Sequence, residues 1–280
     1  MRVITETLLK EYREYLIAEE KSKATIEKYM GDLRKFQQYA GSQEVTKALV
    51  MAYKEQLVSS QRYEISSINS FLVALNRFFE FAGWYDVRVK TYKVQKAAFA
   101  PENKYLTRAE YKRLVEAAKR KGNVRLAHIL NTICSTGIRI SELSYITVSG
   151  VKRGKVVIHN KGKIRTILIP AKLQKALGIY IAGRHLTQGP VFCTVSGMAV
   201  DRSNVWREMK GLCKEARVDA EKIFPHNLRH LFAQCFYELK KDIAKLADVL
   251  GHNSIETTRI YIRTTCEEHR KQLEMLNLVI

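Results

Sequence analysis

The chain has 280 residues, of which 46% are hydrophobic and 27% are charged, so it can bury the core of one large or two modest globular domains. Lysine and arginine outnumber aspartate and glutamate by 48 to 28, which gives a net charge of +20. Such an excess favours nucleic acid as the partner over a merely solubilising surface. Five cysteines without a C-x-x-C pair argue against a zinc ribbon and a disulfide framework. We find no signal peptide and no membrane-spanning apolar run, and we expect a cytoplasmic, nucleoid-associated protein.

The first 85 residues show apolar side chains at helical spacing. Four amphipathic helices are predicted there, at about 6–20, 22–41, 46–57 and 66–83. Gly41 stands where a C-cap glycine belongs. Four short helices of this kind form a small bundle, so residues 1–85 are predicted to be a separate helical domain, with the aromatic stripes as its core.

Residues 86–104 are basic and lack a helical stripe. They include few acids and five cationic side chains, which are Arg88, Lys90, Lys93, Lys96 and Lys104. This composition predicts an interdomain linker. It suits a segment that crosses a DNA backbone, and it would suit a plain solvated tether equally well.

Residues 105–280 are predicted to form a mostly α domain with a small antiparallel β-sheet. Thr107 and Glu110 make a capping box at a helix start. Two β-branched runs, 156–159 and 164–169, flank a turn and predict a hairpin. Further helices are predicted at 107–122, 126–136, 171–184, 203–216, 226–239, 242–250, 254–262 and 265–277.

Four short motifs follow one another in this second domain. They are T-G-I-R-I-S-E-L at 136–143, the hairpin turn with Lys161, P-H-N-L-R-H at 225–230, and L-G-H at 250–252 followed by Tyr261. Any one of these side chains taken alone has an ordinary structural explanation, such as a surface arginine or a histidine at a helix end. The ordered set is much harder to explain in that way.

The chemistry of these residue types points to phosphoryl transfer. Two arginines can grip the non-bridging oxygens of one phosphate, because guanidinium is a planar, permanently charged fork. A tyrosine hydroxyl is an oxygen nucleophile once it loses its proton, and histidines transfer protons near neutral pH. No tight carboxylate cluster accompanies them, which argues against a two-metal nuclease. We therefore expect metal-free attack of tyrosine on a phosphodiester, without a cofactor.

The motifs resemble those of the tyrosine recombinases of the phage integrase family, and the chain is most similar to the small Xer-like members. The resemblance covers nearly the whole length, as a core-binding domain at 1–85, a linker at 86–104 and a catalytic domain at 105–280. It implies the catalytic set Arg139, Lys161, His226, Arg229, His252 and Tyr261, with Tyr261 as nucleophile. Lys163 stands in the same turn and remains an alternative to Lys161.

The resemblance further implies a site-specific recombinase that forms a 3′-phosphotyrosine link and a Holliday junction without ATP. The outcome could be mobile-element integration or excision, inversion, or dimer resolution. Two alternatives stay open: a catalytically silent DNA-binding protein on the same scaffold, and a type IB topoisomerase-like enzyme that relaxes DNA.

The implied partners are double-stranded DNA and further copies of this chain. We expect a homotetramer on paired sites, and a monomer or weak oligomer without DNA. No arm-binding domain is expected ahead of the first helix. The tail after Tyr261 has apolar residues at helical spacing, and it could dock on a neighbouring protomer or on its own domain.

Overall fold

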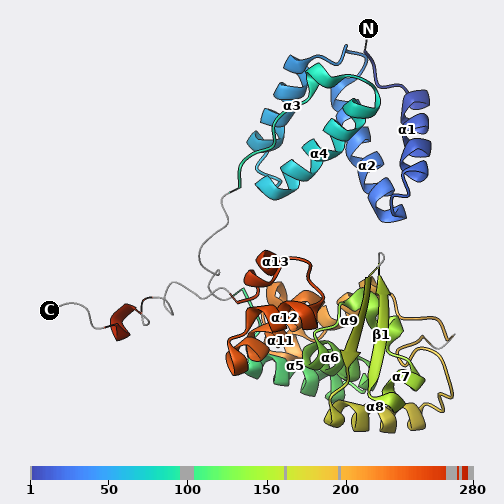
Figure 1. Ribbon diagram of the computed structural model, residues 1–280, viewed down its shortest axis with the longest axis vertical. Coiled ribbons are helices and arrows are strands. Elements are labelled where there is room, and N and C mark those ends of the chain that lie inside the picture. Colours follow the sequence, from blue (N-terminus) through green and yellow to red (C-terminus); the bar gives the residue numbers. More distant parts are fainter. Residues whose placement is uncertain are drawn as a thin grey trace. The chain divides into compact units, whose positions relative to one another are not determined.

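The computed structural model describes residues 2–94, 104–160, 163–194, 197–262, 270 and 273–276. The chain divides into two compact units, Met1–Lys96 and Ala97–Ile280, whose elements are labelled in Figure 1. Within the described ranges, no helix is both long enough and apolar enough to cross a membrane.

The N-terminal unit is a bundle of four helices. They are α1 (Glu6–Ala18), α2 (Lys23–Ala40), α3 (Lys47–Ser59) and α4 (Ile65–Phe81). The side chains of Thr5, Ser22 and Thr46 cap the first three by accepting a hydrogen bond from a backbone N–H of the first turn. Apolar and aromatic side chains such as Phe36 and Phe78 are fully buried between the helices, so the aromatic stripes of the sequence form a core.

The segment after α4 packs on this bundle. A 3₁₀ turn, η1 (Tyr85–Val87), leads into Val89, which is buried. The Asn76 side chain bonds both backbone groups of Val89, at 3.0 and 2.8 Å, and Asn69 does the same with Tyr92, at 2.8 and 2.9 Å. The first part of the predicted linker is therefore held against α4, and residues 95–103 lie outside the described residues.

The C-terminal unit is mostly helical with one two-stranded sheet. Its elements are α5 (Arg108–Arg120), α6 (Val124–Thr136), η2 (Ile140–Tyr145), α7 (Val148–Arg153), β1 (Lys155–Asn160), β2 (Lys163–Leu168), α8 (Ala171–Gly183), α9 (Arg202–Lys210), α10 (Cys213–Ala216), η3 (Ala220–Lys222), α11 (Pro225–Lys240), α12 (Ile243–Leu250) and α13 (Ile255–Arg259). The predicted fold class, mainly α with a small antiparallel sheet, is confirmed. The capping box of Thr107 and Glu110 is present at α5.

The hairpin pairs β1 with β2 in antiparallel register, from Lys155 opposite Leu168 to Asn160 opposite Lys163. Its two faces differ in burial as strand alternation requires. Ile158 and Ile167 are buried in the core of the unit, whereas Leu168 on the other face is 71% exposed. The Tyr145 hydroxyl of η2 donates to the His159 carbonyl at 2.7 Å, which ties the motif at 136–143 to the hairpin.

Three elements differ from the prediction. The helix expected at 203–216 ends at Lys210 and resumes as α10, and the helix expected at 254–262 is the five-residue α13. The helix α7 was not predicted, because valine, serine and glycine at 148–150 are weak helix formers. Its support comes from the Thr147 cap and from burial of Val148 and Val151. The helix expected at 265–277 falls largely outside the described residues.

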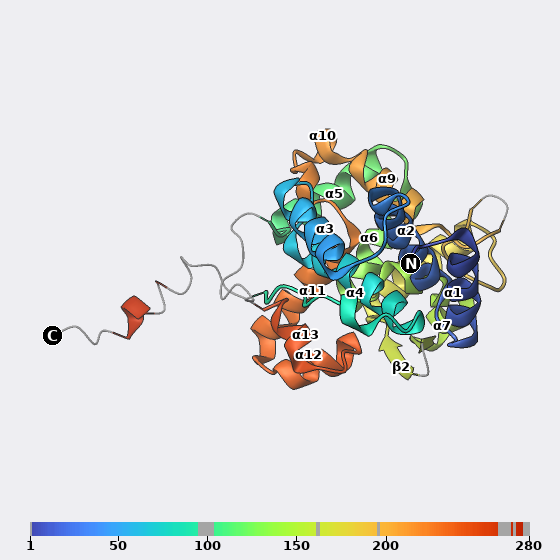
Figure 2. The same ribbon diagram turned by 90° about the horizontal axis from the view of Figure 1, so that it is seen from above.

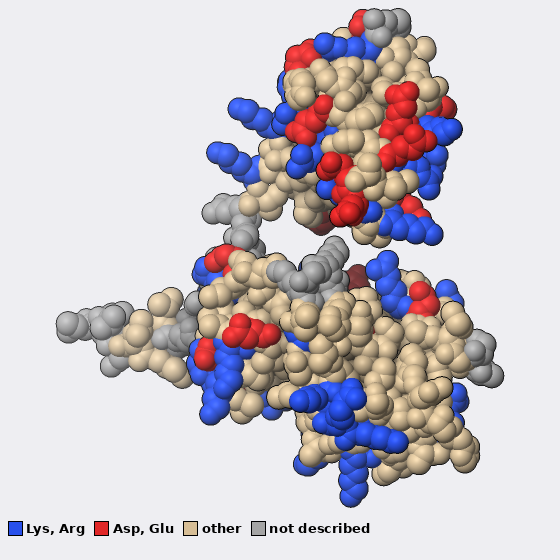
Figure 3. Space-filling view, turned by 45° about the vertical axis from the view of Figure 1, so that its right-hand side comes forward, with Lys and Arg blue, Asp and Glu red and all other residues tan. Residues whose placement is uncertain are grey.

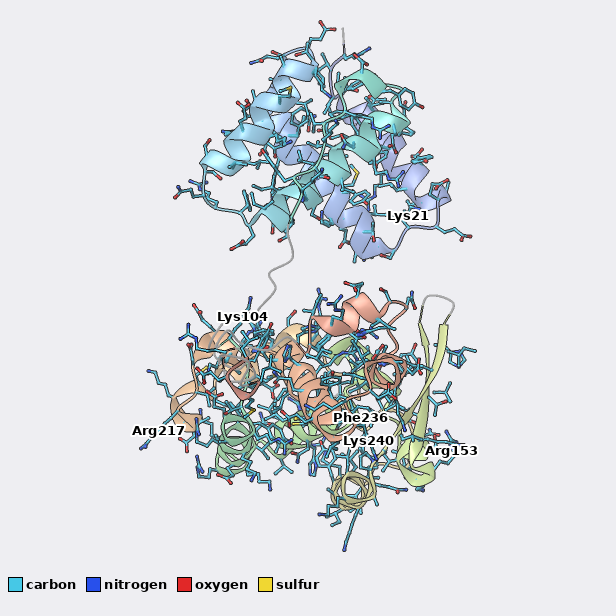
Figure 4. All side chains as sticks on the ribbon, turned by 60° about the vertical axis from the view of Figure 1, so that its left-hand side comes forward. Lys21, Lys104, Arg153, Arg217, Phe236 and Lys240 are labelled. Carbon is cyan, nitrogen blue, oxygen red and sulfur yellow. The ribbon has the colours of Figure 1, made fainter. Side chains whose placement is uncertain are left out.

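Helices α12 and α13 lie beside each other and next to α11, as both ribbon views show (Figures 1 and 2). On the face drawn in Figure 3, basic side chains project from both units, and acidic groups lie among those of the N-terminal unit. Figure 4 labels two exposed cations at the margins of the C-terminal unit, Arg153 at the end of α7 and Arg217 after α10.

Candidate active site

The side chain of Arg229 lies at the centre of the candidate site. It projects from the second turn of α11, a helix that begins with Pro225, and it is 1% exposed. Its Nη1 donates to the Gly137 carbonyl, and its Nη2 donates to the Leu250 carbonyl at 2.8 Å. The Nε–H is also buried and meets no acceptor among the described residues.

Two helix ends stabilise this buried cation. The carbonyl of Leu250 ends α12 and that of Gly137 follows α6, so both carbonyl partners lie at the negative ends of helices. Gly137 and Gly251 both have φ of +64°, the left-handed conformation that glycine adopts without steric cost. A Cβ at Gly137 would also lie 2.5 Å from the Phe232 ring. The glycines of the T-G and L-G-H motifs are thus required by backbone geometry and close packing.

His252 lies against the same arginine, and its tautomer follows from its partners. Its Nε2 is 2.9 Å from Arg229 Nη2. Because guanidinium can only donate, Nε2 must accept and the ring proton must be on Nδ1. That Nδ1 is 2.9 Å from the hydroxyl of Thr258, a buried residue of α13, and its N–H donates a hydrogen bond to the hydroxyl oxygen. In this arrangement the Nε2 lone pair of His252 faces the arginine.

Tyr261 is held by packing, which includes three histidine rings, and by a hydrogen bond with one of them. Its side chain is 5% exposed and packs with Ala233, Leu246 and Leu250 from α11 and α12. The phenol oxygen is 2.9 Å from His226 Nε2. The hydroxyl therefore lies within proton-transfer distance of an imidazole, at the start of the helix that carries Arg229.

Arg139 belongs to the same electrostatic cluster, and a carboxylate holds it. Its Nη1 donates to Glu142 Oε1 at 3.1 Å, and its backbone N–H donates to Glu142 Oε2 at 2.9 Å. The Arg139 side chain is 38% exposed, whereas that of Glu142 is 2% exposed. A second arginine, Arg165 of β2, reaches the other side of this carboxylate at 2.5 Å.

The charges of these groups shift one another's pKa values. Burial lowers the pKa of Arg229 to about 10, helped by repulsion from Arg139 and opposed by Tyr261; it is still a cation at neutral pH. Burial and the charges of Arg229, Arg139 and Arg165 lower the pKa of His252 to about 4. Partial desolvation and the charges of Arg229 and Arg139 also lower the pKa of His226. Both histidines are therefore neutral at pH 7 and can accept a proton or a hydrogen bond.

Burial alone would raise the pKa of Glu142. The backbone hydrogen bond from Arg139 and the charges of Arg165 and Arg139 outweigh it, and the pKa of Glu142 is lowered below its usual range. The carboxylate is thus ionised when the site is assembled.

The structure brings five of the six predicted residues into this cluster: Arg139, His226, Arg229, His252 and Tyr261. Lys161 lies outside the described residues. Glu142 lay inside a motif without an assigned role, and Arg165 and Thr258 were not singled out. Glu142 bonds Arg139 three residues away, but no pattern in a single sequence marks Arg165 and Thr258, because their partners are 6 to 85 residues away in the chain. The assignment of catalytic roles stays a prediction at this point.

Comparisons with known proteins match both units. The Phage integrase family matches residues 104–268, and the Phage integrase N-terminal SAM-like domain matches residues 9–85. The tyrosine recombinase XerA of Pyrococcus furiosus is 31% identical over 289 residues, which covers 99% of this chain and 96% of the relative.

Solved structures of similar proteins also match this chain over nearly its whole length. A crystal structure of XerA recombinase is 26% identical, covers 99% of this chain and 100% of its own, and has a TM-score of 0.55. A lambda integrase tetramer bound to a Holliday junction has a TM-score of 0.73 and covers 91% of this chain and 76% of its own; at 16% identity it shows the fold alone.

Fold, site and matches together define the class of tyrosine recombinases. The chain belongs to the phage integrase family and is an enzyme of site-specific DNA recombination. The resemblance inferred from the sequence motifs is thereby confirmed.

Proposed function

We propose that this enzyme cuts and rejoins DNA through a covalent 3′-phosphotyrosine link on Tyr261. The observation that carries the proposal is the 2.9 Å contact of the Tyr261 hydroxyl with His226 Nε2, beside the buried guanidinium of Arg229. The Tyr261 oxygen bonds to phosphorus, its proton passes to His226, and the bond from phosphorus to the 5′ oxygen breaks. The leaving oxygen takes a proton from Lys161, which the resemblance assigns to this step.

The two arginines bind the scissile phosphate. Arg139 offers the guanidinium edge that does not contact Glu142, and Arg229 contributes its buried positive charge. Charge on the non-bridging oxygens grows in the transition state, so fixed cations there lower the barrier. His252 holds Arg229 in place through Nε2 and can contribute a donor to the phosphate only in its protonated form or other tautomer.

The covalent link conserves the energy of the phosphodiester bond. A free 5′ hydroxyl from another strand can therefore attack the phosphotyrosine by the reverse reaction, without ATP and, in this proposal, without metal. Repeated on paired sites by four protomers, the reaction gives a Holliday junction and then recombinant DNA. The similar lambda integrase structure is described as a tetramer on such a junction, which supports this assembly.

Without DNA we propose a monomer or weak oligomer. The tail after Tyr261, most of which lies outside the described residues, could exchange between protomers on DNA. The protein would act on chromosomal or mobile-element DNA in the cytoplasm.

The test begins by finding the site. Wild-type protein is incubated with fragmented DNA from the organism that carries the gene, and the DNA ends trapped on protein are sequenced. A duplex of that sequence with a nick next to the cleavage position then serves as a suicide substrate, because the short 5′ product diffuses away.

Wild type is expected to accumulate a covalent complex through a 3′ phosphate, and Tyr261→Phe is expected to form none. Tyr237→Phe is a matched control, since it removes a tyrosine hydroxyl from α11 that no hydrogen bond connects to His226. Equal trapping by wild type and Tyr261→Phe would refute the nucleophile. Relaxation of any supercoiled plasmid without recombinant products would instead indicate a topoisomerase-like enzyme.

A further inference from the structure

The side chain of Arg165 connects three parts of the site that are far apart in sequence. It projects from β2, the strand that follows the turn containing Lys161. Its Nη2 contacts Glu142 Oε2 at 2.5 Å, and its Nη1 contacts the carbonyls of Leu250 and Val249 at 2.5 and 3.2 Å. One guanidinium thus joins the hairpin, the Arg139 turn and the end of α12 that precedes His252.

This contact depends on a glycine at position 251. Gly251 is the residue where α12 ends, and a Cβ there would lie 2.5 Å from Arg165 Cδ. The Arg165 side chain is 14% exposed and that of Glu142 is 2% exposed. Because both ions are largely removed from water, breaking this pair would leave an uncompensated buried charge, which costs more than breaking a surface pair.

The Glu142 carboxylate is shared between two arginines. Its Oε1 accepts from Arg139 Nη1, and its Oε2 accepts from the Arg139 backbone and from Arg165. An arginine and a carboxylate without competitors pair through two parallel hydrogen bonds. Together with the Arg139 backbone N–H, Arg165 occupies Oε2, which restricts the Arg139 side chain to a single bond with Oε1 and leaves the rest of that guanidinium for the phosphate.

We propose that Arg165 is a positioning residue for strand cleavage: it holds Glu142 so that Arg139 presents its free edge to the scissile phosphate. The inference rests on the proposed function of this site. Arg165 acts through Glu142 and Arg139 and does not itself touch the phosphate, since its two terminal nitrogens are already bonded to protein oxygens and its Nε is buried from solvent. Its bonds to the carbonyls of Val249 and Leu250 hold the end of α12, which precedes His252, in a fixed position relative to Glu142.

The test compares Arg165→Met with wild type on two nicked duplexes of the recovered site. One carries the natural phosphodiester at the cleavage position, and the other carries a methylphosphonate, in which one charged oxygen is replaced by a neutral methyl group. Removing a cation that stabilises the charge of the phosphate should slow cleavage less on the methylphosphonate, because that substrate carries less negative charge. The readouts are the single-turnover rate of covalent complex formation and the Kd for DNA.

We expect Arg165→Met to lower the cleavage rate on the phosphodiester about a hundredfold, the cost of misplacing a reacting group by about 1 Å. The loss on the methylphosphonate should be about tenfold or smaller, and Kd should change by no more than about threefold, because the lost interaction is specific to the transition state. Arg120→Met is the matched control: it breaks an arginine–glutamate pair with Glu215 on the surface, and both rates should stay at the wild-type level.

A purely structural role predicts the same fractional loss on both substrates, and that result would overturn the proposal. A loss of DNA affinity as large as the loss of cleavage would overturn it too. If Arg165→Met fails to fold, Arg165→Lys replaces it, since lysine keeps the charge but lacks the fork that bridges Glu142 and Leu250. It should show a smaller loss with the same dependence on phosphate charge.

A double-mutant cycle with Glu142→Gln tests whether the effect of Arg165 on cleavage passes through Glu142. If Arg165 acts through Glu142, adding Arg165→Met to Glu142→Gln should cost little further rate, whereas fully additive losses would contradict the mechanism. The Tyr261→Phe variant distinguishes failure of the proposed function from failure of the role proposed for Arg165. Without Tyr261-dependent cleavage by wild type the proposed function fails, while wild-type cleavage with an unimpaired Arg165→Met removes only the role of Arg165.

Discussion

His230 makes the stability of the C-terminal unit depend on pH. The side chain is 2% exposed, and its ring stacks on Tyr105 with centroids 3.6 Å apart. Burial lowers its pKa from 6.5 to about 4, although interactions with the Ile260 backbone and the Gln234 side chain oppose the shift. The unfolded chain therefore binds a proton near pH 6.5 that the folded chain does not bind until about pH 4.

The direction in which stability changes with pH follows from proton linkage. Where the unfolded state binds more protons, stability falls as pH falls, so the loss begins near pH 6.5 and is complete below about pH 4. With these two pKa values for His230, the free energy of unfolding should be about 2 kcal/mol lower at about pH 5 than at neutral pH from this group alone.

The perturbation is His230→Phe, which keeps an aromatic ring against Tyr105 and removes the titration. Urea unfolding is followed by fluorescence of Trp206 of α9, in a Trp84→Phe background that silences the tryptophan of the N-terminal unit. Between about pH 7 and about pH 5, wild type should lose about 2 kcal/mol more than the variant.

Tyr105→Phe is the control, because it preserves both the histidine and the stacked ring and should keep the wild-type dependence on pH. Equal pH dependence in wild type and His230→Phe would refute the reasoning. It would mean that the buried imidazole takes up its proton in the folded protein as readily as in the unfolded chain.

Three further predictions concern the site and its partner. Arg139→Ala should slow covalent complex formation about a hundredfold or more while changing the Kd for DNA little, because its contact strengthens in the transition state; equal losses of rate and affinity would leave it only a phosphate-positioning role. Gly137→Ala should lower the free energy of unfolding by about 2 kcal/mol or more, from the left-handed φ of +64° and the contact with Phe232. Gly178→Ala in α8, with nothing within 4 Å of the added Cβ, should be neutral or stabilising, and similar losses in urea unfolding for both would contradict this. The logarithm of the DNA Kd should rise with that of salt concentration by about 0.9 per phosphate contact, and a flat response in filter binding would exclude the basic surface as the DNA site.

The helical elements could be predicted because their signals are local. The stripe of apolar residues in α2, its Ser22 cap and its terminal Gly41 all lie within one segment, and the structure reproduces each. The same holds for the capping box of α5 and the two strands of the hairpin. The helix α7 escaped prediction because its stability comes from tertiary burial of Val148 and Val151, and its own propensity is weak.

The site was only partly predictable. Tyr261 and Arg229 are polar groups in characteristic motifs, so the sequence singles them out. Arg165 gives no such signal, because an arginine in a β-strand is ordinary until the strand is placed next to Glu142 and the end of α12. The proton position on His252 likewise depends on Arg229 and Thr258, which lie 23 and 6 residues away.

The amino-acid sequence by itself determined the family, the helical fold class and the residue types available for chemistry, because these depend on composition, periodicity and motif order. Only the tertiary structure decided how those residues act on one another. The burial of Arg229 at two helix ends, the neutral state of His252 and the shared carboxylate of Glu142 are effects of distance and desolvation. Those quantities exist only once segments remote in the chain have packed together.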